Sequence, residues 1–96
     1  DDHADELETS VMMHYHPELV DLSEAGSGTA GGFAPATLRE GVAWVPRNWS
    51  RVSKDTGIGS PAAATAEKGA RFAAAVVARY AELLRDLCLD DLYMPL

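Results

Sequence analysis

The chain has 96 residues, of which 47% are hydrophobic, and its formal net charge is -7. This length suits one small domain, and the hydrophobic content is too high for a disordered segment. The acidic balance argues against binding to nucleic acid or to an anionic membrane surface, because both need clustered basic residues and the chain has only 8 Lys and Arg. Cys88 is the single cysteine, so we expect neither an intrachain disulfide nor a cysteine-based zinc motif. A lone cysteine and the absence of a membrane-length apolar run favour a reducing, cytoplasmic location.

The first part of the chain is expected to form one helix and one short strand. Apolar residues recur at helical spacing over residues 5–15, which predicts a helix there. Asp5 is placed to cap this helix, and Pro17 is placed to end it. Val20 and Leu22 then alternate with acidic residues, a pattern typical of a half-buried strand.

The second part is expected to contain a loop, a second strand and a long helix. Residues 25–36 are glycine-rich and aperiodic, which predicts a surface loop, and no phosphate-loop motif accompanies them. Residues 42–45 form a β-type run that Pro46 ends. Ser60 is placed to cap a helix over residues 61–87. The stripe of apolar residues on that helix is wide, so we expect it to pack against elements outside this chain; its members are Phe72, Val76, Tyr80, Leu83, Leu84 and Leu87.

The densest group of polar residues lies at the start of the chain: Asp1, Asp2, His3, Asp5, Glu6 and Glu8. Imidazole and carboxylate side chains suit a divalent metal or general acid–base chemistry. The same acids also suit the start of a helix, because Asp5 and Glu8 have the spacing of a capping box. The residues alone leave both interpretations open.

Other candidates have equally simple structural explanations. His14 and His16 could bind metal only on an extended backbone, and histidines at the end of a helix also interact well with its dipole. Trp44 and Trp49 could close over a small ligand or pack against the fold. Three arginines in the same region could bind a carboxylate or be solvated; they are Arg39, Arg47 and Arg51.

The stretch HADELETSVMMHYHPELVDL resembles the creatininase family of metal-dependent amidohydrolases. Members of that family carry His-Ala/Gly-x-x-x-Glu-Thr-Ser, an apolar helix and then Pro-Asp/Glu-Leu-Val. The residues here that match are His3, Ala4, Glu8, Thr9, Ser10, Pro17, Glu18, Leu19 and Val20. Downstream, TGIGSPAAATAEKGARF resembles the segment that opens the family's C-terminal helix, with matches at Ser60, Ala64, Ala66, Glu67, Lys68 and Gly69.

The resemblance implies a fold and a set of partners. Family members are α/β proteins that fold as a three-layer α/β/α sandwich with a mostly parallel sheet and a two-metal site at its edge. Residues 1–96 resemble the C-terminal segment of one such domain, incomplete on its own. The family's Glu-x-His and Asn-Gly-His ligand motifs are not among these residues. An N-terminal segment or a second chain is therefore expected to supply the remaining ligands, and a homo-oligomer is expected.

The resemblance also implies an activity and a site. His3 matches the family's active-site histidine, which contacts substrate or moves a proton, and Asp2 matches a substrate-contacting acid. Glu8 matches a carboxylate at or near the metals. The expected reaction is hydrolysis of a non-peptide C–N bond, cyclic or linear, or a related ring bond, in a small molecule, with two zinc, manganese or iron ions. The alternatives are a non-catalytic remnant or interaction module, and a stand-alone metal binder that uses His3, His14 and His16.

Overall fold

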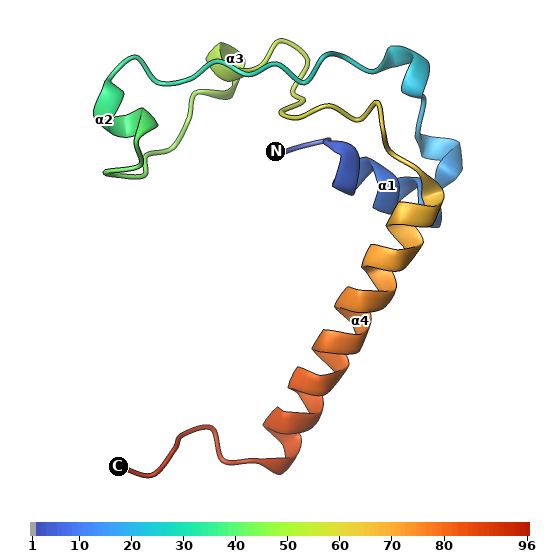
Figure 1. Ribbon diagram of the computed structural model, residues 1–96, viewed down its shortest axis with the longest axis vertical. Coiled ribbons are helices and arrows are strands. Elements are labelled where there is room, and N and C mark those ends of the chain that lie inside the picture. Colours follow the sequence, from blue (N-terminus) through green and yellow to red (C-terminus); the bar gives the residue numbers. More distant parts are fainter. Residues whose placement is uncertain (1) are drawn as a thin grey trace.

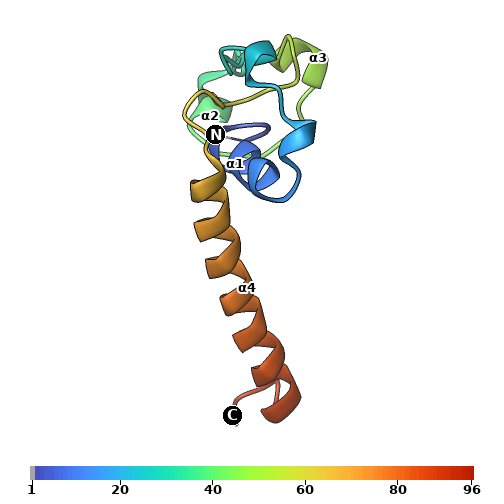
Figure 2. The same cartoon turned by 90° about the vertical axis from the view of Figure 1, so that its right-hand side faces the viewer.

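The computed structural model describes residues 2–96 and contains six helical segments (Figure 1). They are α1 (Glu6–Tyr15), η1 (Pro17–Leu19), η2 (Leu22–Glu24), α2 (Ala36–Arg39), α3 (Trp49–Val52) and α4 (Ala66–Leu89). Figures 1 and 2 show α4 as a long arm that leaves a smaller body built from α1, the short helices and the loops. Residues 90–96 follow α4 as a tail without regular structure. None of the helices in residues 2–96 combines the length and the apolar character needed to cross a membrane.

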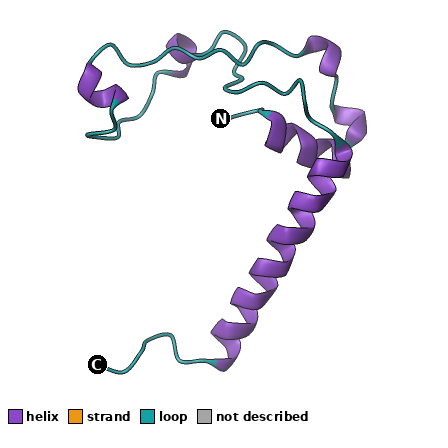
Figure 3. Ribbon diagram, in the orientation of Figure 1, coloured by secondary structure: helices purple, strands orange, loops and turns teal. Residues whose placement is uncertain are grey.

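The expected α/β/α sandwich with a parallel sheet is wrong for this chain. Residues 2–96 contain no strand, and Figure 3 accordingly shows helices and loops only. The only β pairing among them is one isolated antiparallel bridge between His3 and Ile58. A strand needs a neighbour to take its backbone hydrogen bonds. Here the two expected strands bond locally instead: the Val20 N–H donates to Pro17 at 3.2 Å, and the Val42 N–H donates to Thr37 at 3.1 Å.

The first helix forms as predicted because its end signals are local. The Asp5 carboxylate accepts a hydrogen bond from the Glu8 N–H at 2.9 Å, which satisfies one of the free donors of the first turn. The helix ends at Tyr15, two residues before Pro17, as expected of a chain approaching a proline.

The long helix forms, but it begins five residues later than predicted. Thr65, and not Ser60, is its N-cap: the Thr65 hydroxyl accepts from the Lys68 N–H at 3.2 Å. The Ser60 hydroxyl accepts from the Ala62 N–H at 3.3 Å and so closes a turn of its own. Both residues can cap a helix, and the contact of α4 with α1 selects the second.

The contact between α1 and α4 holds the body to the arm. Ser10 of α1 is fully buried, and its hydroxyl donates to the Glu6 carbonyl at 2.6 Å and accepts from the Thr65 N–H at 3.1 Å. Opposite it, Gly69 of α4 comes so close that a Cβ there would lie 1.8 Å from the Ser10 carbonyl oxygen. Beside them, Lys68 Nζ pairs with Glu6 Oε1 at 2.5 Å. The ion pair is half exposed and so contributes at most about 1 kcal/mol, which leaves close packing and buried hydrogen bonds as the main attachment.

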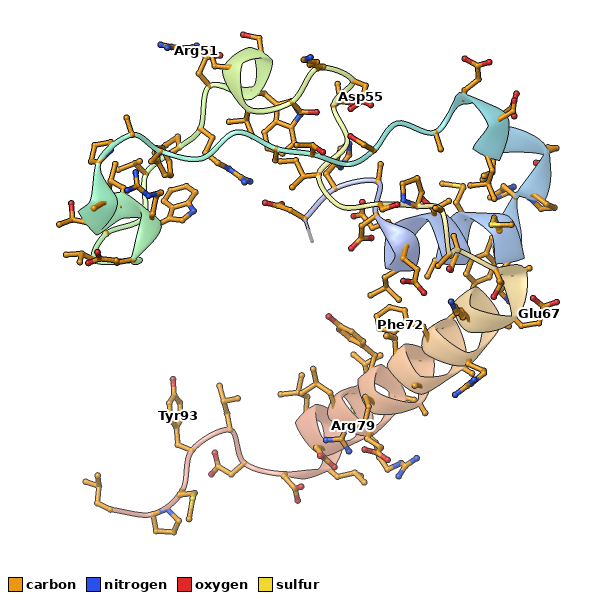
Figure 4. All side chains as sticks on the ribbon, turned by 45° about the horizontal axis from the view of Figure 1, so that its top comes forward. Arg51, Asp55, Glu67, Phe72, Arg79 and Tyr93 are labelled. Atoms are coloured by element: carbon orange, nitrogen blue, oxygen red, sulfur yellow. The ribbon has the colours of Figure 1, made fainter. Side chains whose placement is uncertain are left out.

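Most of α4 packs against no other element among residues 2–96. The radius of gyration is 18.2 Å, whereas a compact domain of this length would have about 12.5 Å. The buried hydrophobic residues of residues 2–96 are only Ile58, Ala64 and Ala73. Large apolar side chains stay exposed along the arm and the tail; among them are Phe72, Val77, Tyr80, Leu84, Leu87, Leu92, Tyr93 and Met94. Figure 4 shows Phe72 on the side of α4 that faces α1, with Tyr93 standing out from the tail.

Replacing Gly69 with alanine should destabilise the contact between the two helices. Alanine favours a helix by about 1 kcal/mol over glycine, but its Cβ would overlap the backbone of α1. We expect the free energy of unfolding to fall by about 2 kcal/mol, measured by urea unfolding of the intact protein. Gly32→Ala is the control, because a Cβ there would meet only the Arg39 Cδ at 3.9 Å. Equal stability of the two variants would contradict this account of the crossing.

Candidate active site

The backbone of His3 is fixed by the isolated bridge to Ile58. The N–H groups of Asp2 and His3 donate to the Ile58 carbonyl at 2.9 and 3.1 Å, and the Ile58 N–H donates to the His3 carbonyl at 2.8 Å. Ile58 itself is buried, so the bridge ties the start of the chain to the fold. The side chain of His3 remains half exposed and accessible to a ligand.

A turn at Ala4 then brings His3 back over the start of α1. Ala4 has a φ of +51°, in the left-handed region, which costs a residue with a side chain about 1 kcal/mol. The Ala4 N–H donates to Glu8 Oε2 at 2.7 Å, and the same oxygen lies 3.6 Å from His3 Nδ1. The structure therefore brings together His3 and Glu8, the two residues on which the expected active site depends. It also shows that Glu8 caps the turn before the helix.

Two residues far along the chain complete this cluster. Arg47 Nη2 lies 2.5 Å from Asp2 Oδ2, and the Arg47 guanidinium carbon lies 4.9 Å from the centre of the Trp49 ring. Trp49 in turn meets His3 edge to face, with ring centres 5.9 Å apart and planes at 79°. A T-shaped aromatic pair of this kind contributes about 0.5–1.5 kcal/mol. Asp2, His3, Arg47 and Trp49 are hereafter called the N-terminal cluster.

Glu8 also lines a cavity of about 400 Å³ between α1 and the loops around residues 20–28 and 55–61. The cavity carries four carboxylates: Glu8, Asp21, Glu24 and Asp55. Hydrogen bonds from the side chain and the backbone N–H of Ser23 lower the pKa of Asp21, so this carboxylate stays ionised to lower pH than usual. Glu8 is thus the member of the His3–Glu8 pair that borders an open, acidic hollow.

The remaining histidines lie apart from this cluster. The rings of His14 and Tyr15 are 4.6 Å apart, and His16 Nδ1 lies 3.3 Å from Glu18 Oε1. Among the described residues, no three His, Cys, Asp or Glu side chains come together in an arrangement that could hold a metal ion. A stand-alone metal site of His3, His14 and His16 therefore does not form.

The sequence named Arg47 and Trp49 as candidates but could not choose between ligand binding, packing and solvation. Trp44 and Arg51 looked equivalent to them. In the structure Trp44 is 84% exposed, and Arg51 is exposed without an ion-pair partner in residues 2–96. The partners Asp2 and His3 lie more than 40 residues away, and no local pattern could have indicated this pairing.

His3 and Glu8 have the right donor atoms for a divalent metal but are too few to hold one alone. Imidazole nitrogen and carboxylate oxygen suit zinc, manganese or iron. A zinc site in an enzyme usually takes three protein ligands. The donor set of His3 and Glu8 therefore fits one part of a metal site and not a complete one.

Comparisons with known proteins found two matches. Residues 1–84 match the model of the creatininase family, creatinine amidohydrolase. A crystal structure at 2.11 Å of a "putative creatinine amidohydrolase" from Bacteroides fragilis NCTC 9343 is 55% identical in sequence and similar in fold, with a TM-score of 0.91. The match covers 98% of this chain and 37% of the Bacteroides chain. None of the curated proteins matches this chain.

Fold and sequence together place the chain in a class of related proteins that share this C-terminal segment. Within that class it belongs to the creatininase family, as the HADELETS stretch predicted. The chain spans little more than a third of the length of the Bacteroides structure it resembles.

The capping role of Glu8 can be tested by comparing two substitutions. Glu8→Ala removes the acceptor of the Ala4 N–H, and we expect a loss of about 1 kcal/mol in the free energy of unfolding. Glu8→Gln keeps an oxygen that can accept this bond, so most of the stability should remain. Urea unfolding of the intact protein measures both. A loss that is the same for glutamine and alanine would mean that the bond to Ala4 is not what stabilises the turn.

Proposed function

We propose that this chain is one portion of a metal-dependent amidohydrolase that hydrolyses a non-peptide C–N bond, cyclic or linear, or a related ring bond of a small molecule. The observation that carries the proposal is the pairing of His3 Nδ1 with Glu8 Oε2 at 3.6 Å, in a chain of the creatininase family. The bridge to Ile58 and the turn at Ala4 hold both residues in place before any ligand binds. Such pre-arranged groups are what a catalytic site needs.

His3 is the residue that would move a proton. The Glu8 carboxylate faces Nδ1 and so favours the tautomer with hydrogen on that nitrogen. The second ring nitrogen, Nε2, then carries no hydrogen, so it would first accept a proton from the attacking water and then pass that proton to the leaving nitrogen of the substrate. Asp2 lies next to His3 and would accept a hydrogen bond from an N–H group of the same substrate.

Glu8 would hold a metal ion, together with ligands that lie outside residues 2–96. Zinc, manganese and iron all suit its carboxylate oxygen. When bound, two such ions would supply an activated water and polarise the carbonyl group that is attacked. His3 and Asp2 would orient the substrate beside them.

A partner is part of this proposal. The remaining ligands would come from a preceding segment of the same protein or from a second chain, and the exposed apolar face of α4 would pack against that part. We further propose that the protein is a cytoplasmic homo-oligomer. The exposed side chains of α4 support it, because soluble monomers rarely leave so much contiguous apolar surface open.

A second candidate is a non-catalytic remnant or interaction module. The observation in its favour is that residues 2–96 do not by themselves bring together three metal-binding side chains. Intact mass and metal analysis of the protein purified under native conditions would separate the two candidates. A partner polypeptide or a longer chain with bound divalent metal supports the enzyme, and a metal-free 96-residue chain alone supports the module.

Replacing His3 with alanine tests its catalytic role. In the intact enzyme we expect amide hydrolysis to slow by at least about 100-fold, because the proton donor to the leaving group is lost. His14→Ala is the matched control, since His14 lies on the exposed face of α1 away from the cluster and should leave the rate unchanged. Turnover that survives in His3→Ala would rule out this role.

Metal content measured on Glu8→Gln tests whether Glu8 is also a ligand. A neutral amide oxygen is a much weaker ligand than a carboxylate, so the variant purified at full length should lose most of one metal equivalent. Glu24→Gln serves as the control, because Glu24 lines the same cavity but does not pair with His3. Full metal occupancy in Glu8→Gln would leave Glu8 with a capping role alone.

A further inference from the structure

The N-terminal cluster joins two segments that are far apart in the sequence. Asp2 and His3 come from the start of the chain, whereas Arg47 lies just before α3 and Trp49 is the first residue of that helix. Three contacts connect them: the ion pair of Arg47 with Asp2, the Arg47 guanidinium over the Trp49 ring, and the edge-to-face contact of Trp49 with His3. Arg47 therefore contacts Asp2 and Trp49 contacts His3, and Asp2 and His3 are the two candidate substrate-contacting residues.

We propose that Trp49 and Arg47 are positioning residues for the active site, Trp49 for the imidazole of His3 and Arg47 for the carboxylate of Asp2. This inference rests on the proposed function, in which Asp2 and His3 contact the substrate. Neither Trp49 nor Arg47 needs to touch the substrate itself.

Trp49 restricts the ring of His3 from the side. The bridge to Ile58 fixes only the backbone of His3, so the side chain could still rotate. Glu8 contacts one ring nitrogen, and the indole of Trp49 lies against the ring at 79°. Two contacts at different points of a flat ring fix its orientation, as partners of a catalytic histidine must.

Arg47 forms an ion pair with the Asp2 carboxylate and fixes its orientation. Its guanidinium takes one carboxylate oxygen, Oδ2, and a carboxylate has a second oxygen with which to accept a hydrogen bond. The Trp49 ring lies under the same guanidinium and restrains it. Asp2 is 43% exposed, so without Arg47 its side chain would move freely in solvent.

The two positions have different expected signatures in kinetics. Trp49→Leu should lower kcat by about tenfold or more, because a misoriented His3 affects the proton-transfer step, and should raise KM less than Arg47→Met does, because Trp49 acts on Asp2 only through Arg47. Arg47→Met should instead raise KM by about fivefold, because Asp2 binds substrate before reaction. Arg47→Lys keeps the charge but not the planar group, and should restore part of the loss. Trp44→Leu and Arg51→Met are the matched controls and should behave as wild type.

The experiment combines these kinetics with nuclear magnetic resonance of the intact enzyme, labelled in its histidine rings. Trp49→Leu should shift the ring signals of His3, since the ring current of the indole is lost, whereas Trp44→Leu should leave them in place. Unchanged His3 signals in Trp49→Leu would overturn the positioning role. So would a loss of activity of the same size in Trp44→Leu, which would indicate a general effect on folding.

The same measurements keep this inference separate from the proposed function. If wild-type enzyme hydrolyses no cyclic or linear amide, the amidohydrolase proposal fails. Shifted His3 signals in Trp49→Leu would still support the coupling of Trp49 to His3. If wild type is active and both variants of the cluster match it in kcat and KM, the proposed function stands and the positioning inference is overturned.

Discussion

The close approach of Gly69 to Ser10 is the constraint on which the rest of this structure depends. It places the backbones of α1 and α4 in direct contact and buries the Ser10 hydroxyl between two hydrogen bonds, one within α1 and one to Thr65. The second of these bonds fixes the start of α4. With α1 held on α4, the first turn of α1 has a defined place, and so has Glu8, on which the candidate site is built.

The site is assembled from short-range and long-range contacts of different kinds. Glu8 reaches back to Ala4 within one turn, so this part needs little beyond the local sequence. The bridge to Ile58 and the contacts with Arg47 and Trp49 come from the other end of a long loop. That loop has little regular structure of its own. Its contacts with Asp2 and His3 therefore help to fix its position.

The arm formed by α4 carries apolar side chains that residues 2–96 do not bury. Its apolar side chains are exposed, and the radius of gyration is far above that of a compact domain. The similar Bacteroides structure has a chain nearly three times as long as the part matched here.

The sequence by itself determined the features that depend on neighbouring residues and on family motifs. The spacing of Asp5, Glu8 and Pro17 set the bounds of α1, and the HADELETS stretch indicated the creatininase family, because caps and motifs act within one or two turns. Tertiary structure alone decided that Thr65 rather than Ser60 begins α4, since burial against Ser10 selects between two possible caps. It also decided that the expected strands bond to their own neighbours, because a strand exists only where a second backbone lies beside it.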